Sequence, residues 1–196
     1  MRALVVHADP DPAGFTTQLF DAAVRGLEAS GHDVETISLL GERFDWRMSA
    51  DERRAYETDE PIVDEQVRAH AEALGRAEAI VFVYPTRWFG LPALLKGWIE
   101  RVFVMGVAFE LDPRTRRVRG RLRQVRRLAA VTTYPSSRLA TMRYADGGRR
   151  TIGRSIRLTC NWRCRTTWLG LYGADRRTDS ERLAFADEVG QRMGRL

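Results

Sequence analysis

Short runs of apolar residues alternate along this chain with longer segments in which apolar residues recur at helical spacing. Five of the short runs predict β-strands, at residues 2–7, 34–39, 79–84, 128–133 and 166–172. The segments between them have the periodicity of helices that bury one face. The pattern therefore predicts strands and helices in regular succession.

Five helical segments are predicted between and after these strands. They are residues 17–30, a helix beginning at Pro61, a helix beginning at Pro92, a segment from about 148 to 158, and a helix beginning at Thr178. Proline is favoured in the first turn of a helix, and Glu181 completes a capping box with Thr178. We expect buried stripes that include Phe20, Ala23, Val24 and Leu27; Val63, Val67 and Leu74; Leu95, Trp98 and Val102; and Leu183, Ala186, Val189 and Met193.

The strand at residues 79–84 has no polar alternation, which is typical of a parallel sheet covered on both faces. Strands joined by helix-length connections predict an α/β fold with a parallel sheet and right-handed crossovers. Ligands of such folds bind at the carboxyl ends of the strands. Residues 8–17, 84–91 and 132–138 are therefore the loops in which we expect the functional chemistry.

A chain of 196 residues is long enough for a full core, and we expect a single domain over residues 1–196. No apolar run approaches the roughly 20 residues that span a bilayer. Residues 9–14 interrupt any signal-peptide pattern near the start. We therefore expect a cytoplasmic protein that has no membrane partner.

The net charge of +6 comes almost entirely from arginine, because Lys96 is the only lysine. The densest cluster, residues 114–127, lacks the interleaved aromatic residues of single-strand binders. We interpret it as a solvated surface loop, with an anionic ligand tail as an alternative and nucleic acid as an unlikely partner. Cys160 and Cys164 are too few for a disulfide framework, and we expect two structural thiols and no metal site.

The first loop leads into a helix N-terminus, where free backbone N–H groups and the helix dipole favour phosphate. Gly14 allows close approach of the backbone, and Thr16 and Thr17 supply hydroxyl groups. A helix cap provided by either threonine is the structural alternative. The loop lacks the glycine patterns of Rossmann and Walker sites, which disfavours those two classes.

The second and third loops carry aromatic and hydroxyl side chains after buried strands. Pro85, Trp88, Phe89 and Gly90 follow the strand at 79–84, and Tyr134 follows the strand at 128–133. The two aromatic loops suit a flat heteroaromatic ring, and the helix start suits its phosphate. Together they predict a flavin site.

These segments resemble the flavodoxin-like NAD(P)H:quinone oxidoreductases, the family of DT-diaphorase and modulator of drug activity B. The most specific match is "YPTRWFGLPALLKGWIERVF", residues 84–103. The segments "HADPDPAGF", "FDWRMSADERRAY" and "VTTYP" fall in the family's order, so the resemblance covers essentially the whole chain.

The resemblance implies a flavodoxin-like five-stranded parallel sheet, of strand order 2-1-3-4-5, with helices on both faces. It implies a homodimer that binds FMN or FAD noncovalently, takes hydride from NAD(P)H and passes two electrons to a quinone or a related electron-poor aromatic acceptor. It assigns the flavin phosphate or ribityl chain to Gly14, Phe15 and Thr16. It assigns the isoalloxazine to Pro85, Thr86, Arg87, Trp88, Phe89, Thr132, Thr133 and Tyr134.

The chain departs from the family's pattern in two of these loops. Asp9 precedes Pro10 where the family usually has histidine, Gly14 replaces a serine and Thr16 an asparagine. In the third loop Tyr134-Pro135 replaces Gly-Gly. A descendant of the fold with weakened or lost flavin binding, acting as a non-redox enzyme on a small aromatic molecule or as a regulatory subunit, is the alternative function. The catalytic residues stay unassigned, with Tyr134 and Tyr144 as candidates.

Overall fold

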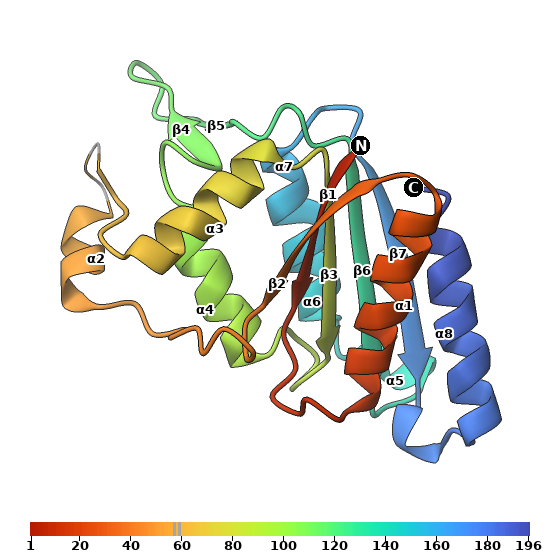
Figure 1. Cartoon of the computed structure of the whole chain (residues 1–196). Helices are drawn as coiled ribbons and strands as arrows, with labels where there is room; N and C mark the ends of the chain where they lie inside the picture. The colour runs from red at the N-terminus through yellow and green to blue at the C-terminus, as the bar shows by residue number, and fades with distance from the viewer. Residues whose placement is uncertain (57, 59) are drawn as a thin grey trace.

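Five parallel strands form the centre of the structure, a computed structural model that describes residues 1–56, 58 and 60–196 (Figure 1). They are β1 (Arg2–His7), β2 (Asp33–Ser38), β3 (Ala79–Pro85), β6 (Arg127–Tyr134) and β7 (Arg165–Tyr172). Their order in the sheet is β2-β1-β3-β6-β7. In order of appearance these strands stand 2-1-3-4-5, which confirms the expected α/β flavodoxin-like topology.

Helices cover both faces of this sheet (Figure 1). One face carries α1 (Phe15–Ala29) and α8 (Asp179–Met193), and the other carries α3 (Glu65–Arg76), α4 (Ala93–Val102), α6 (Gly147–Arg150), a π-helical turn (Thr151–Ile156) and α7 (Arg157–Thr159). Alternate strand residues enter the two layers, because side chains of a strand point to opposite faces. Val81 and Val83 pack towards α1 and α8, whereas Ile80 and Phe82 belong to the opposite layer.

The two helices on the first face approach closely at a pair of glycines. A β-carbon at Gly26 of α1 would lie 2.1 Å from the main-chain oxygen of Gly190 in α8. Only a residue without a side chain fits there. This close packing fixes α8 against α1 and so places the side chains of α8 beside the start of α1.

Three helix predictions needed correction. Helix α1 begins two residues before the expected start, after Gly14 as its N-cap. Helix α3 begins at Glu65 rather than at Pro61, because the Asp64 carboxylate accepts a hydrogen bond from the Val67 N–H, and Val63 is exposed. In α8 the buried stripe is Phe185, Val189 and Met193, at spacing i, i+4, i+8, and Leu183 is exposed.

The polar segment between β2 and α3 also contains a helix. Helix α2 (Ala50–Ala55) begins with a capping box between Ser49 and Glu52. The Glu52 carboxylate accepts a hydrogen bond of 2.7 Å from the buried Arg101 guanidinium of α4. Because both side chains are buried, this ion pair attaches α2 firmly to α4.

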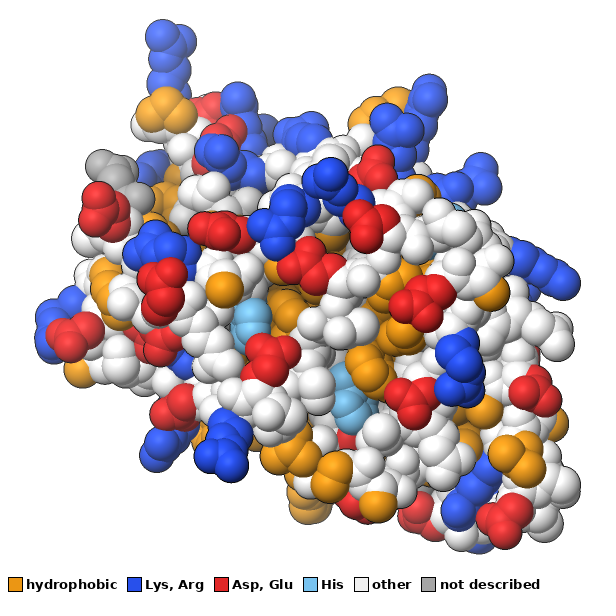
Figure 2. Space-filling view, in the orientation of Figure 1, with side chains coloured by type: hydrophobic (Ala, Val, Ile, Leu, Met, Phe, Trp, Pro, Cys, Tyr) orange, Lys and Arg blue, Asp and Glu red, His pale blue; other side chains and the backbone are white. Residues whose placement is uncertain are grey.

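The arginine-rich segment is exposed as expected, but it is not only a loop. Strands β4 (Phe109–Leu111) and β5 (Val118–Gly120) form an antiparallel hairpin. Arg119 pairs with Asp112, and Arg121 with Glu110 at 3.3 Å. Basic side chains stand out along this end of the molecule in Figure 2.

Within the described residues, no helix combines the length and the apolar character that crossing a membrane requires.

Candidate functional site

The three predicted loops meet at the carboxyl ends of the central strands around one cavity of about 260 Å³. It is bounded by the start of α1, the end of β3, the end of β6 and one side chain of α8. The lining residues are Asp9, Asp11, Gly14, Phe15, Thr16, Pro85, Thr86, Arg87, Thr133, Pro135, Ala174, Asp175 and Arg182.

The start of α1 contributes a helix N-terminus with no side-chain cap. Gly14 is the N-cap, and no side chain of the described residues accepts from the first-turn N–H groups. The cap alternative for the threonines is therefore wrong: Thr16 is buried, and the Thr17 hydroxyl donates to the main-chain oxygen of Asp11 at 3.3 Å. Uncapped N–H groups and the positive end of the dipole are thus directed at the cavity.

Asp9 is a buried carboxylate in this cavity. Its Oδ1 accepts a hydrogen bond of 3.1 Å from the Asp11 N–H, which holds the loop in an Asx turn. The missing side chain at Gly14 leaves room for the other oxygen, since a β-carbon there would lie 3.2 Å from Asp9 Oδ2. A carboxylate at this place disfavours a bound anion unless a nearby cation compensates.

Arg182 of α8 brings a guanidinium group to the same cavity, and the sequence analysis did not identify it. Its Nη2 donates to the main-chain oxygen of Ala174 at 3.1 Å, and its Cζ lies 5.9 Å from the centre of the Phe15 ring. Its Nε is buried and has no hydrogen-bond partner among the described residues. An unsatisfied guanidinium N–H in a cavity is a donor available to a ligand. Nothing in the local sequence of α8 marks this residue, because the helix packing brings it to the site.

The second loop places some of its predicted residues in the cavity and others outside. Pro85, Thr86 and Arg87 line it. Trp88 and Phe89 do not, because they occupy the middle of a tight turn in which Arg87 and Gly90 exchange two main-chain hydrogen bonds of 3.1 and 2.8 Å. Trp88 is 99% exposed.

The turn at Trp88 and Phe89 has strained backbone. Both residues have positive φ, 48° and 55°, a conformation unfavourable for side-chain-bearing residues. The turn is held by the Gly147 N–H, which donates to the Phe89 oxygen at 2.7 Å. The Phe89 ring also packs against Tyr144, with ring centres 4.9 Å apart. Strain of this kind is often kept at functional sites.

The third loop turns its tyrosine away from the cavity. Thr133 and Pro135 line the cavity, whereas the Thr132 hydroxyl is buried at 2.9 Å from that of Thr86.

Tyr134 is buried, stacks on Tyr172 with ring centres 4.5 Å apart, and donates a hydrogen bond to Asp146. Burial and the bond to Asp146 raise the pKa of Tyr134, so it stays neutral. The Trp168 indole N–H donates to its hydroxyl at 3.1 Å.

The structure therefore brings seven of the predicted contacts into one cavity. The seven are Gly14, Phe15, Thr16, Pro85, Thr86, Arg87 and Thr133. Trp88, Phe89, Thr132 and Tyr134 lie around it without lining it. Tyr144, the other catalytic candidate, is exposed beside Phe89.

Residues 1–177 match the family model described as flavodoxin-like fold, so the chain belongs to this family. NAD(P)H dehydrogenase [quinone] 1 of Cavia porcellus is 29% identical over 125 residues, which cover 55% of this chain and 45% of that protein. The chain thus spans about half the length of this curated relative.

Solved structures share the fold along the whole chain. An NAD(P)H:quinone oxidoreductase from Methanothermobacter marburgensis superposes with a TM-score of 0.81 at 24% identity, covering 100% of this chain and 98% of that one. An FMN-dependent NADH-azoreductase from Bacillus anthracis, solved in complex with FMN, gives a TM-score of 0.76 at 16% identity over 99% and 98% of the chains.

Proposed function

We propose that this protein is a flavin-dependent NAD(P)H oxidoreductase that passes two electrons to a quinone or a related electron-poor aromatic acceptor. The observation that carries the proposal is the cavity at the carboxyl ends of β3 and β6. There an uncapped helix N-terminus, a free guanidinium N–H and a wall of proline and threonine side chains converge. The names of the relatives support the same activity.

The residues present fit a flavin that carries a phosphate. The N–H groups that begin α1 and the Arg182 guanidinium would hold the phosphate, and Arg182 would offset the charge of Asp9. Pro85, Thr86, Thr133 and Pro135 would border the ring. We propose FMN ahead of FAD, in line with the azoreductase complex. When bound, the flavin supplies the hydride and electron chemistry, and the protein supplies orientation and electrostatics.

Arg87 stands exposed at the rim of the cavity and makes no ion pair with the described residues. We assign it to the anionic part of the nicotinamide donor, because a guanidinium binds phosphate oxygens in pairs. The prolines at the wall remove backbone donors from the ring's surroundings. This chain's part in the reaction is thus to hold the flavin and the nicotinamide donor in the correct relative orientation and to exclude water between them.

The proposal includes a homodimer. Trp88, Leu139, Met142 and Tyr144 are exposed apolar or aromatic side chains in the segments that follow β3 and β6, two of them on α5 (Arg138–Arg143). Phe89 and Tyr144 connect the turn to the segment after α5 by their ring contact. A group of exposed apolar side chains beside a site marks an interaction surface. We propose that a second copy covers it, and that the protein works in the cytoplasm, where nicotinamide donors are available.

Quinone-dependent oxidation of NADH and NADPH by the flavin-loaded protein tests the activity. The expected result is turnover that requires the protein, the flavin and a simple quinone together. Protein that binds flavin but does not oxidise either nicotinamide cofactor would contradict the oxidoreductase proposal and would leave the cavity with a non-redox role.

A further inference from the structure

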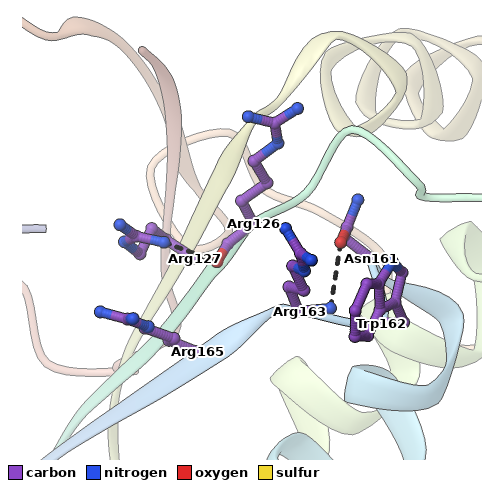
Figure 3. Close-up of a pocket in the computed structure, with 6 residues that line it drawn as sticks. All are labelled: Arg126, Arg127, Asn161, Trp162, Arg163 and Arg165. Atoms are coloured by element: carbon purple, nitrogen blue, oxygen red, sulfur yellow. Dashed lines mark hydrogen bonds between the residues drawn. The ribbon is translucent and has the colours of Figure 1, made fainter.

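A second cavity, of about 550 Å³, lies at the opposite end of the sheet from the candidate flavin site. It is bounded by the starts of β6 and β7 and by the short loop before β7 (Figure 3). The strands run roughly 23 Å between the two ends, at about 3.3 Å per residue. Its six lining residues are Arg126, Arg127, Asn161, Trp162, Arg163 and Arg165, and none of them lines the candidate flavin site.

Four of the six lining residues are arginines. Arg127 and Arg165 are direct neighbours in the register of β6 and β7, and their side chains point the same way in Figure 3. No carboxylate lines the cavity, and these four guanidinium groups form no ion pair with acidic side chains of the described residues. Neighbouring like charges repel one another, so this arrangement favours a bound anion.

The cavity is also held in shape by the main chain. The Arg165 N–H donates to the Arg126 oxygen at 3.1 Å, and the Asn161 N–H donates to the Val125 oxygen at 3.1 Å. The Asn161 side-chain oxygen accepts from the Arg163 N–H at 3.0 Å. Arg127 Nε donates to the main-chain oxygen of Leu196 at 2.6 Å. The backbone that carries the arginines is therefore fixed before a ligand arrives.

Trp162 adds an aromatic surface to this charged cavity. It is 72% exposed, and the Arg163 guanidinium lies 4.4 Å from the centre of its ring. The cavity therefore has both kinds of group that a nucleotide uses, because bases stack on aromatic rings and phosphates pair with guanidinium groups. A cavity of this volume falls within the range of small-ligand sites.

We propose that this cavity binds a nucleoside di- or triphosphate, with the phosphates on Arg126, Arg127, Arg163 and Arg165 and the base on Trp162. The site is independent of the proposed flavin site, since the two share no residue. The limited extent of this second cavity favours a free nucleotide over a nucleic acid, because a nucleic-acid backbone needs a groove that continues beyond a few phosphates.

Calorimetric titration with ATP and with inorganic pyrophosphate tests the proposal. The test variant is Arg126→Gln/Arg163→Gln/Arg165→Gln, which removes three exposed guanidinium groups. The matched control is Arg53→Gln/Arg114→Gln/Arg117→Gln, which removes the same charge from exposed positions elsewhere. We expect saturable ATP binding that the test variant weakens by about a thousandfold, at about tenfold for each of the three charge-assisted contacts. The control is expected to stay within about twofold of the unaltered protein.

Two further variants test where the base of ATP stacks and which of the two cavities binds ATP. Trp162→Leu is expected to weaken ATP binding by about tenfold and to leave pyrophosphate binding unchanged, because only the base loses its stacking partner. Arg182→Gln, in the flavin cavity, is expected to leave ATP binding unchanged. The proposal is overturned if ATP does not saturate the protein or if the charge-matched control loses as much affinity as the test variant. It is also overturned if a short single-stranded oligonucleotide binds far more tightly and displaces ATP, which would indicate a nucleic-acid surface.

Discussion

The Asp9 carboxylate occupies space that a side chain at position 14 would need. A β-carbon on Gly14 would lie 3.2 Å from Asp9 Oδ2 and 3.1 Å from the main-chain oxygen of Asp11. In the sequence these are two separate departures from the family pattern. In the structure they form one coupled feature, because a β-carbon at position 14 would crowd the acid at position 9.

This coupling predicts a non-additive pair of substitutions. Gly14→Ser is expected to lower the free energy of unfolding by about 1 kcal/mol through overpacking, and Asp9→Ala by about 1 kcal/mol through the lost bond to the Asp11 N–H. The double variant should lose less than the sum, by about 0.5 kcal/mol or more. Urea unfolding measures all three. Gly75→Ser, at a glycine of α3 with nothing within 4 Å, is the control; strict additivity of the pair would contradict the coupling.

Arg182 is predicted to hold the anionic end of the flavin. Arg182→Gln removes the guanidinium whose Nε has no partner among the described residues, and we expect FMN affinity to fall about tenfold, the loss of one charge-assisted contact. Arg192→Gln changes an exposed arginine of the same helix and should leave FMN affinity unchanged. Equal affinities of the two variants would show that Arg182 does not contact the cofactor.

Trp88 is predicted to contribute to association and not to the fold of one protomer. Because its side chain is 99% exposed and its φ is 48°, Trp88→Asn removes no packing within the protomer and introduces a residue that tolerates this conformation. The free energy of unfolding of the dissociated chain should stay unchanged or rise by about 0.5 kcal/mol. Sedimentation analysis should show weaker dimerisation. A monomeric unaltered protein would refute the homodimer.

His7 is predicted to make stability depend on pH. Burial lowers its pKa from 6.5, against the opposing charges of Asp9 and Asp21, and its ring stacks on Phe20 with centres 4.9 Å apart. The unfolded chain therefore binds a proton at a higher pH than the folded chain does. Stability is then retained above pH 6.5 and lost as the pH falls from 6.5 towards the lower folded pKa.

The matched variant for this effect is His7→Gln, which removes the titrating ring. Between pH 6.5 and the folded pKa, the unaltered protein should lose up to about 1.4 kcal/mol more per pH unit than the variant. Urea unfolding at a series of pH values gives both slopes. Parallel slopes for the two proteins would mean that His7 titrates alike in the folded and unfolded chains.

The strands could be predicted because each carries a local signal, whereas their order followed from the family resemblance. The unbroken apolar run at residues 79–84 indicates a central strand whatever its neighbours are, and β3 lies in the middle of the sheet. The buried face of a helix was harder to predict where the helix has few apolar residues. Leu183 is exposed and Phe185 buried, because the packing of α8 on α1 selects the face.

The candidate site was predicted in its loops but not in its long-range contacts. Gly14 and Thr86 follow strands and Thr133 lies near the carboxyl end of one, so the rule for parallel sheets places them together. Arg182 comes from a helix remote in sequence, and only tertiary packing brings it to the cavity. The direction of Tyr134 depends on the alternation of β6 and on Asp146 as its partner, neither of which a loop motif contains.

Titration of the purified, flavin-free protein with FMN and FAD tests the central claim most directly. The cavity between α1, β3 and β6 predicts saturable binding of one flavin per chain, with quenched flavin fluorescence and visible absorbance that stays with the protein on gel filtration. Protein that remains colourless and leaves the fluorescence of both flavins unchanged would contradict the account.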